Sequence, residues 1–410
     1  MNLIDFLRDP IIAISDWITN LFSNWGMATD WATFLLYLIG AAVLGISALL
    51  MTLFFIWAER KIIGRLQDRV GPNQIGPWGI FQSVADMVKI FIKEHIIPTG
   101  VDPIPYHLAP IVLVASVLMV WAIVPFSNTV YGSNLNVAVI FLLAVGGLGE
   151  VGVMMAGWGS NNKYALISAF RASAQMISYE VPMAIILLIP VLLSSSMSMN
   201  DIVNAQNIPY ILVLPFGALI FFIASIAENG RAPFDLAEAE SELVAGFNIE
   251  YSGLKFGMFY VADFLRAFTS ALIFSTLFLG GWKGPGAEAI PVLGAFYLIA
   301  KSLIIWFLGV WIRGSFPRYR IDQMMNINWK FLTPISLVLF MLVILFSKLV
   351  EPVGQNMQYL VILIINLGLF FLSFRILNNQ NKKKVVAEVG SRTRPVAKPD
   401  NLFSKDVSRG

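Results

Sequence analysis

The chain contains nine apolar stretches, each long enough to cross a lipid bilayer as a helix. A transmembrane helix needs roughly 17–25 mostly apolar residues, because the hydrocarbon layer is about 30 Å thick. The stretches cover residues 33–58, 107–126, 136–157, 176–196, 209–228, 255–280, 291–312, 331–350 and 356–376. These lengths predict an all-α fold: a polytopic membrane helix bundle of about nine transmembrane helices, with interfacial amphipathic helices beside it.

Composition supports a membrane protein and limits its chemistry. The chain is 57% hydrophobic and only 13% charged, whereas soluble domains are about 45–50% apolar and about 25% charged. It has no cysteine, so iron–sulfur ligation by cysteine and disulfide bonds are excluded. The two histidines, His95 and His107, are too few for a histidine-rich metal site. We therefore expect no iron–sulfur cluster and no histidine-rich metal site in this chain. If the protein takes part in redox chemistry, the electrons must come from a partner.

Basic residues are divided unevenly between the two sets of loops. If the loop after the first span is cytoplasmic, the loops and C-terminal segment on its side hold 23 of the 28 lysines and arginines, and the opposite side holds 3. Cytoplasmic loops carry the excess of positive charge. The distribution predicts a multi-pass protein of the inner membrane, with its N-terminus outside and its C-terminus in the cytoplasm.

Four segments follow from this pattern. Residues 1–30 are predicted as an N-terminal interfacial helix, since Trp17 and other large apolar residues share one helical face; a helix packed on other protein is an equal alternative. Residues 31–352 form an eight-span domain, 353–378 an additional ninth span, and 379–410 a basic, disordered cytoplasmic tail. The tail either contacts an anionic surface or is simply solvated.

The first long loop combines turn residues with an amphipathic segment. Gly71, Pro72 and Asn73 specify a turn. In the following residues, 80–92, apolar side chains share one helical face and polar ones the other. This segment predicts a helix at the membrane surface, either as a plain anchor or as the lip of a cavity that reaches a docked soluble subunit.

The second long loop is acidic. From 228 to 250 it carries six carboxylates against Arg231 alone. On a helix, Asp235, Glu238 and Glu242 would share one face, and like charges so close repel unless protons or a partner's cations compensate them. The loop therefore predicts a proton-handling site or a docking surface, and a solvated acidic face is the simpler alternative.

Five ionisable residues lie inside predicted spans: Glu150, Glu180, Asp263, Arg266 and Lys301. Each costs about 2.5–3.5 kcal/mol at mid-membrane on insertion scales. Asp263 and Arg266 could form a local pair at i, i+3, but five such residues favour a polar interior path. With Glu228 and the acidic loop, they predict a proton relay toward the bilayer centre.

One apparent nucleotide motif has a different explanation. Residues Gly147 to Gly152 match the dinucleotide pattern G-x-G-x-x-G, yet they lie within an apolar span with no strand before them. Small residues that let two helices pack closely explain the pattern better.

The loop motifs together resemble the H subunit of bacterial complex I, the proton-pumping NADH:quinone oxidoreductase; the equivalent in mitochondria is subunit 1. The resemblance covers about residues 33–350. The motifs that carry it are Glu59-Arg-Lys61, Gln67-Asp-Arg-Val-Gly-Pro-Asn73, Ala85-Asp86, Ala156-Gly-Trp-Gly-Ser-Asn-Asn-Lys-Tyr164, Arg171-Ala-Ser-Ala-Gln-Met-Ile-Ser-Tyr-Glu180, Arg231-Ala-Pro-Phe-Asp-Leu-Ala-Glu-Ala-Glu-Ser-Glu-Leu243 and Pro317-Arg-Tyr-Arg-Ile-Asp-Gln323.

The resemblance implies an eight-helix subunit of a bacterial cytoplasmic membrane complex, without a bound redox centre and thus with no metal or flavin. Its substrate, ubiquinone or menaquinone, would be shared with partners: iron–sulfur and quinone-site peripheral subunits, and small and antiporter-like membrane subunits. Membrane lipid is a further partner and nucleic acid is not. The implied proton path is Glu180, Glu228, Asp235, Glu238, Glu240, Glu242 and Asp263. The implied quinone-chamber region is Glu59, Arg60, Lys61, Gln67, Arg69, Gly71, Pro72, Asn73, Asp86, Arg231 and Phe234.

The chain departs from the family pattern at three places. Asp263 stands where the family usually has glutamate, and Phe264 follows instead of tyrosine. Glu150 occupies a position expected to be apolar, so the resemblance implies no role for it. The ninth span and basic tail exceed the usual eight-span form.

Three alternative functions remain open at this point. The homologous subunit of a membrane-bound hydrogenase is one, although residues 233–243 favour the quinone-linked form. A ferredoxin-dependent photosynthetic complex would keep the same loops and change only the electron donor. A stand-alone ion transporter would usually show internal repeats, and the chain has no repeat at a fixed spacing.

Overall fold

The computed structural model describes residues 9–24, 28–236, 240–350, 352 and 354–392, and this part of the chain is helical. The all-α fold is thereby confirmed. The elements are α2 (Pro10–Asn24), α3 (Thr29–Leu66), η1 (Pro77–Gly79), α4 (Gln82–Ile92), α5 (Pro103–Trp121), α6 (Ala138–Gly159), α7 (Lys163–Ser194), α8 (Met199–Ala205), α9 (Tyr210–Val213), α10 (Pro215–Glu228), α11 (Glu240–Leu243), η2 (Gly246–Asn248), α12 (Gly253–Phe278), α13 (Pro291–Ser315), α14 (Ile321–Ile327), a π-helical turn (Asn328–Leu332), α15 (Thr333–Val350) and α16 (Gln355–Arg392).

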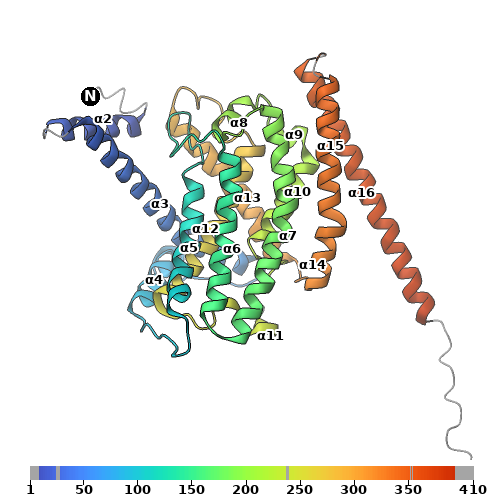
Figure 1. Cartoon of the computed structure of the whole chain (residues 1–410), viewed down its shortest axis with the longest axis horizontal. Coiled ribbons are helices and arrows are strands. Elements are labelled where there is room, and N and C mark those ends of the chain that lie inside the picture. Colours follow the sequence, from blue (N-terminus) through green and yellow to red (C-terminus); the bar gives the residue numbers. More distant parts are fainter. Residues whose placement is uncertain (1–8, 25–27, 237–239, 351, 353, 393–410) are drawn as a thin grey trace, which may run out of the picture.

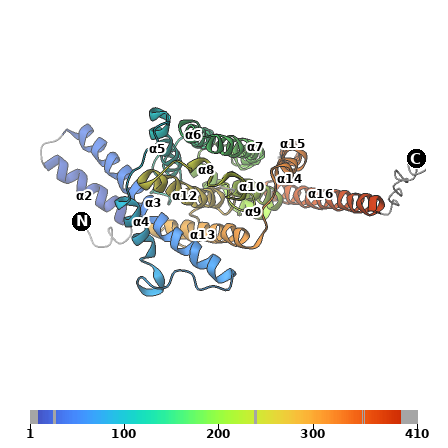
Figure 2. The same ribbon diagram turned by 90° about the horizontal axis from the view of Figure 1, so that it is seen from below.

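The long helices form one bundle with α12 at its centre. In its most apolar stretch 78% of α12 is buried, against 17% of α3. Figure 1 shows α5, α6, α7, α10 and α13 around α12, and Figures 1 and 2 both place α2–α3 at one flank and α15–α16 at the opposite one. The outward faces of α3, α13, α15 and α16 carry many exposed large apolar residues, as expected for helices that meet lipid or other membrane subunits.

Eight helices in the described part of the chain are long and apolar enough to cross a membrane. They correspond to eight of the nine predicted spans. The remaining one, predicted over 209–228, is divided at Leu214 into the short helix α9 and the 14-residue helix α10. Pro215 explains the break, because proline cannot donate the backbone hydrogen bond that a continuous helix needs but suits a first helical turn.

The additional helix α16 supplies a hydrogen-bond acceptor to the start of α10, directly after this break. The side chain of Asn366 on α16 is fully buried, and its Oδ1 accepts a hydrogen bond from the backbone N–H of Gly217, in the first turn of α10, at 3.3 Å. The first N–H groups of a helix have no partner within that helix. Phe370 of α16 also packs edge-on against Phe216 of α10. The ninth span thus stabilises α10, the helix that ends at Glu228.

Both predicted surface helices are present, and the C-terminal segment differs from the expectation. The helix α2 lies crosswise to the bundle at the start of α3 (Figure 1), and α4 covers most of the predicted amphipathic segment. The predicted disordered tail began at residue 379, but α16 continues to Arg392. This stretch has no proline and contains the helix-forming residues lysine, alanine and glutamate. Residues 393–410 lie outside the described part.

Replacing Asn366 tests the contribution of α16. We expect Asn366→Leu to destabilise the chain by about 1 kcal/mol, because it removes the acceptor for the Gly217 N–H in an apolar setting. The measurement is detergent-induced unfolding of the purified protein assembly. Ser373→Ala is the control, since that hydroxyl bonds to Phe370 of its own helix; equal stability of the two variants would contradict this role.

Candidate functional site

Two cavities lie one after the other in the centre of the bundle. The first has a volume of about 60 Å³ and is lined from α5, α6, α7, α10 and α12. The second is about 90 Å³ and is lined from α6, α7, α12, α13 and the loop after α10. A space of roughly 10–15 Å³ that a water-sized sphere can occupy is enough for one water, provided that polar groups can bond to it. Each cavity therefore has room for several waters.

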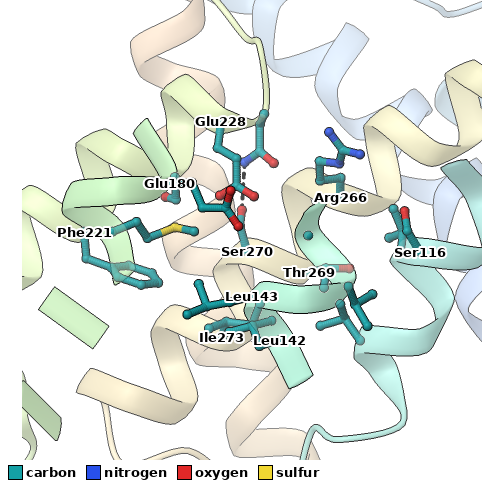
Figure 3. A pocket seen from close by; sticks show the side chains of 17 residues that line it. Ser116, Leu142, Leu143, Glu180, Phe221, Glu228, Arg266, Thr269, Ser270 and Ile273 are labelled. Carbon is teal, nitrogen blue, oxygen red and sulfur yellow. Dashed lines mark hydrogen bonds between the residues drawn. The ribbon is translucent and has the colours of Figure 1, made fainter. Parts of the chain in front are cut away.

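The two cavities share three lining residues: Glu228, Asn229 and Arg266. In the first cavity Glu228 points toward Glu180 (Figure 3). The second cavity adds Asp235 and Asp263 to the shared residues. The arrangement thus brings four of the predicted path acids, Glu180, Glu228, Asp235 and Asp263, to two adjoining cavities.

Glycines on α6 leave the space that the charged groups occupy. A Cβ added to Gly146 would lie 3.7 Å from Oε1 of Glu180 and 3.9 Å from Oε1 of Glu228. A Cβ added to Gly149 would lie 2.4 Å from Nη2 of Arg266, which is too close for any real contact. Gly152 fits against the backbone of Leu113 in α5. Gly152 therefore serves helix packing, as predicted. Gly149 instead makes room for Arg266, and Gly147 has open space around it.

Arg266 does not form the local pair that its spacing from Asp263 suggested. No direct ion pair joins these two described side chains; the guanidinium lies against Gly149 and donates a hydrogen bond to Sδ of Met176 at 3.4 Å. Asp263 faces the second cavity, and Arg266 lines both. Arg266 consequently places a positive charge at the junction of the two cavities.

Glu180 is held in place by its neighbours on α7. The hydroxyl of Tyr179 donates to the carbonyl of Met324, and the carbonyl of Ser178 accepts from the side chain of Asn328 in the π-helical turn. Such π-helical turns are common at functional sites, because they redirect a helix locally. These bonds fix α7 against α14 and the π-helical turn at the two residues directly before the one that reaches into the first cavity.

Lys301 has a structural role instead of a place beside the cavities. Its Nζ donates to the carbonyls of Leu279, Gly281 and Lys283, at 2.9, 2.9 and 2.8 Å. These carbonyls follow the C-terminus of α12, where helix carbonyls lack intrahelical partners. The expectation that all five ionisable residues in the spans belong to one path is therefore wrong for Lys301.

Glu59 forms the centre of a buried ionic network beside the second cavity. Its side chain, on α3, is only 3% exposed and bonds Arg231 at 2.5 Å and also Arg313 of α13. The guanidinium of Arg231 also lies over the ring of Phe264, 4.9 Å from its centroid. Glu59 and Arg231 are among the predicted chamber residues, whereas Arg313 is not. A carboxylate buried in the bundle needs cations beside it, and this requirement could have indicated a second arginine.

The first loop is fastened to α3 just beyond this network. Asp86 on α4 pairs with Arg60 at 2.5 Å and with Lys89 at 3.3 Å. Burial raises the pKa of Asp86, but the hydrogen bonds and charges of Arg60 and Lys89 outweigh it, so the pKa lies below its usual value. Lys61 donates to the carbonyl of Pro72 at 2.8 Å.

The turn residues of this loop differ in exposure. Gly71 adopts a positive φ of 66° close to the carbonyl of Arg60, which suits glycine. Pro72 is half-buried, whereas Gln67, Arg69 and Asn73 are exposed. The predicted chamber residues of this loop thus lie together near α3 and α4, with three side chains available to a partner or ligand.

Asp235 and Glu242 of the acidic loop do not share a helical face, so the expectation is wrong for these two described carboxylates. Asp235 lies in a non-helical segment and faces the second cavity, whereas Glu242 on α11 is half-exposed and pairs with Arg171 at 2.6 Å. The hydrogen bond and charge of Arg171 lower the pKa of Glu242. Glu238 and the side chain of Glu240 lie outside the described residues.

Tertiary contacts explain why the start of this loop is not helical. The amide of Gln175 donates to the carbonyls of Ala227 and Phe234, at 2.6 and 2.7 Å. Phe234 is buried between the rings of Tyr179 and Tyr319, so it packs the loop onto α7 and does not line either cavity. Contacts with α7 therefore outweigh the local helix propensity of this segment.

Among the described residues, no group of three or more histidine, cysteine, aspartate or glutamate side chains is arranged to hold a metal ion. The chemistry open to the two cavities is that of carboxyl groups, guanidinium groups and water, which together can bind and transfer protons.

Comparison with known proteins gives a consistent result. A family model described as NADH dehydrogenase matches residues 39–344. The chain is 42% identical over 345 residues to the H subunit of NADH-quinone oxidoreductase from Dehalococcoides mccartyi (strain CBDB1), covering 84% of this chain and 94% of the relative. It is 44% identical over 314 residues to the H subunit from Geobacillus sp. (strain WCH70), covering 76% and 94%. It is 40% identical over 337 residues to that of Sphingopyxis alaskensis, covering 80% and 97%.

Replacing Glu59 tests the buried network. We expect Glu59→Gln to destabilise the chain by about 3 kcal/mol, because it leaves Arg231 and Arg313 without their shared carboxylate. The measurement is thermal unfolding of the detergent-solubilised assembly. Asp86→Asn is the matched control and should cost less than about 1 kcal/mol, since its partner Arg60 is 46% exposed. A Glu59→Gln variant as stable as the control would contradict the assignment.

Proposed function

Because the chain belongs to the H subunit family of NADH-quinone oxidoreductase (complex I), we propose that it forms the lipid-side part of the quinone chamber and an acidic path that couples quinone reduction to proton movement. The chain is thus a multi-pass membrane subunit of an enzyme complex. The observation that carries the proposal is the pair of adjoining cavities lined by Glu180, Glu228, Asp235 and Asp263.

The path runs from the second cavity to the first. Asp235 and Asp263 line the second cavity together with the two arginines that pair with Glu59, and Glu228 lines both cavities. Carboxyl groups separated by a few waters can exchange protons, because water donates and accepts hydrogen bonds on either side. A proton taken up near Asp263 would pass through Glu228 to Glu180 and leave toward a neighbouring membrane subunit.

The proposed quinone chamber lies at the Asp263 end of this path, opposite to Glu180. Reduction of a quinone to a quinol consumes two electrons and two protons, and the electrons come from a partner because this chain has no cysteine. Glu59, Arg231 and Arg313 form a compact set of charges beside the second cavity. A change of charge at the quinone alters the potential at these groups and hence the proton affinity of the carboxyls that follow.

The orientation of the chain agrees with this role. By the charge distribution in the sequence, the first loop, the acidic loop and the basic C-terminal segment belong to the predicted side that holds 23 of the 28 lysines and arginines. That face is the cytoplasmic one by the positive-inside rule. Peripheral iron–sulfur and quinone-site subunits would dock there, onto α4, α11 and the exposed turn after α3, and antiporter-like subunits would pack in the membrane.

The two acids of the first cavity provide the test. We expect Glu180→Gln and Glu228→Gln to lower coupled NADH:quinone reductase activity by about tenfold or more, because an amide cannot relay a proton. The measurement is quinone reduction and proton uptake in vesicles that contain the assembled complex. NADH oxidation by a water-soluble acceptor should stay unchanged, since it bypasses the quinone.

Glu288→Gln is the matched control, because Glu288 lines a separate groove with residues of α2. Wild-type coupled activity and proton movement in both Glu180→Gln and Glu228→Gln would refute the proposed path.

A further inference from the structure

Glu150 is an acidic residue inside the bundle that lines neither of the two cavities. Glu150 lies in the middle of α6, is half-buried, and stands at a position where an apolar residue is expected. A carboxyl group inside a membrane bundle is unfavourable, so its surroundings must compensate it.

The helical spacing of α6 places Glu150 between the two cavities. Gly146 lines the first cavity and Val153 lines the second. Glu150 is four residues after Gly146 and three before Val153, and residues at these spacings share one helix face. At 1.5 Å per residue, the distance from Gly146 to Val153 along the axis is about 10 Å. Glu150 itself lines neither cavity, but it lies on α6 about halfway between the residue that lines the first cavity and the one that lines the second.

The same level of the bundle holds Arg266. Its guanidinium lies against Gly149, the residue adjacent to Glu150, and it lines both cavities. The charged groups near the carboxyl of Glu150 are Glu180 from α7, Glu228 from α10 and Arg266 from α12. On α5, the side chain near this point is the uncharged Ser116, 3.1 Å from a Cβ added to Gly149. Thus Glu150 interacts electrostatically with two of the predicted path acids and with a cation that offsets part of their charge.

We propose that Glu150 is a further proton-relay residue of this chain, which carries protons past Arg266 between the second cavity and the first. The inference rests on the proposed function and adds a second route beside Glu228 at the junction. In each transfer, the O–H bond of a protonated Glu150 breaks, a water accepts that proton and passes one on, and an O–H bond forms on Glu228 or Glu180. The proton and charge balance without any electron transfer.

The test uses the assembled complex in vesicles and the variant Glu150→Gln, which keeps the size and hydrogen-bonding ability of the side chain. We expect coupled quinone reduction to fall by about three- to tenfold, with unchanged NADH oxidation by a water-soluble acceptor. Glu150→Asp should keep most of the activity, because the carboxyl is retained. The pH dependence of that activity should nevertheless change. Gly147→Gln adds an amide on the same helix, at a position with open space around it, and should behave as wild type.

A double variant distinguishes a proton-relay role of Glu150 from a role as the counter-ion of Arg266. If Glu150 only balances that arginine, removing both charges in Glu150→Gln/Arg266→Gln restores coupled activity, and the inference is overturned. If Glu150 relays protons, the double variant stays impaired. Should Glu150→Gln fail to assemble, the pH profile of Glu150→Asp decides: a wild-type profile overturns the inference and a displaced one supports it.

Parallel measurement of Glu180→Gln and Glu228→Gln distinguishes failure of the inference about Glu150 from failure of the proposed function. Wild-type activity in Glu150→Gln with impairment in the other two overturns the inference about Glu150 alone. Wild-type activity in all three refutes the proposed function as well.

Discussion

An ionised side chain inside a membrane bundle is stable only where cations, hydrogen-bond donors or water compensate its charge. The structure uses two solutions to this constraint. Glu59 is enclosed by Arg231 and Arg313 and is almost completely buried. Glu180 and Glu228 instead face a cavity that has room for water. The first solution fixes a charge in place, and the second leaves carboxyl groups able to exchange protons.

The architecture around these groups follows from the same constraint. The α6 glycines make space for Arg266 and the carboxyl groups, and Gln175 holds the loop after α10 in a non-helical course. As a result, Asp235 and Glu228 reach the same cavity although the loop's sequence suggested one continuous acidic helix face. On the outer side, α16 supplies Asn366 to the broken end of α10. The helix that carries Glu228 is thus secured at its far end by a span that lies beyond residues 39–344, the part matched by the family model.

The fold could be predicted largely from the sequence, because apolar length is a local property. Eight spans, the amphipathic helix α4 and the glycine packing of α6 follow from hydropathy and spacing. The division of the span at Leu214 was not predicted, although Pro215 was visible, because membrane helices often tolerate proline. The site was predictable only in part: the charged residues inside the spans indicated Glu180 and Asp263, and Glu228 was added at the end of a span. The pairing of Glu59 with Arg313, 254 positions away, depends on tertiary structure.

The central claim is that water connects the acids on the two sides of Arg266. The most direct measurement is a high-resolution map of the assembled complex that resolves ordered waters in the membrane. We predict waters in both cavities, hydrogen-bonded to Glu228 and continuous past Arg266 from Asp263 to Glu180. Cavities closed by apolar side chains, with these carboxyl groups turned toward lipid or sealed from one another, would contradict the account.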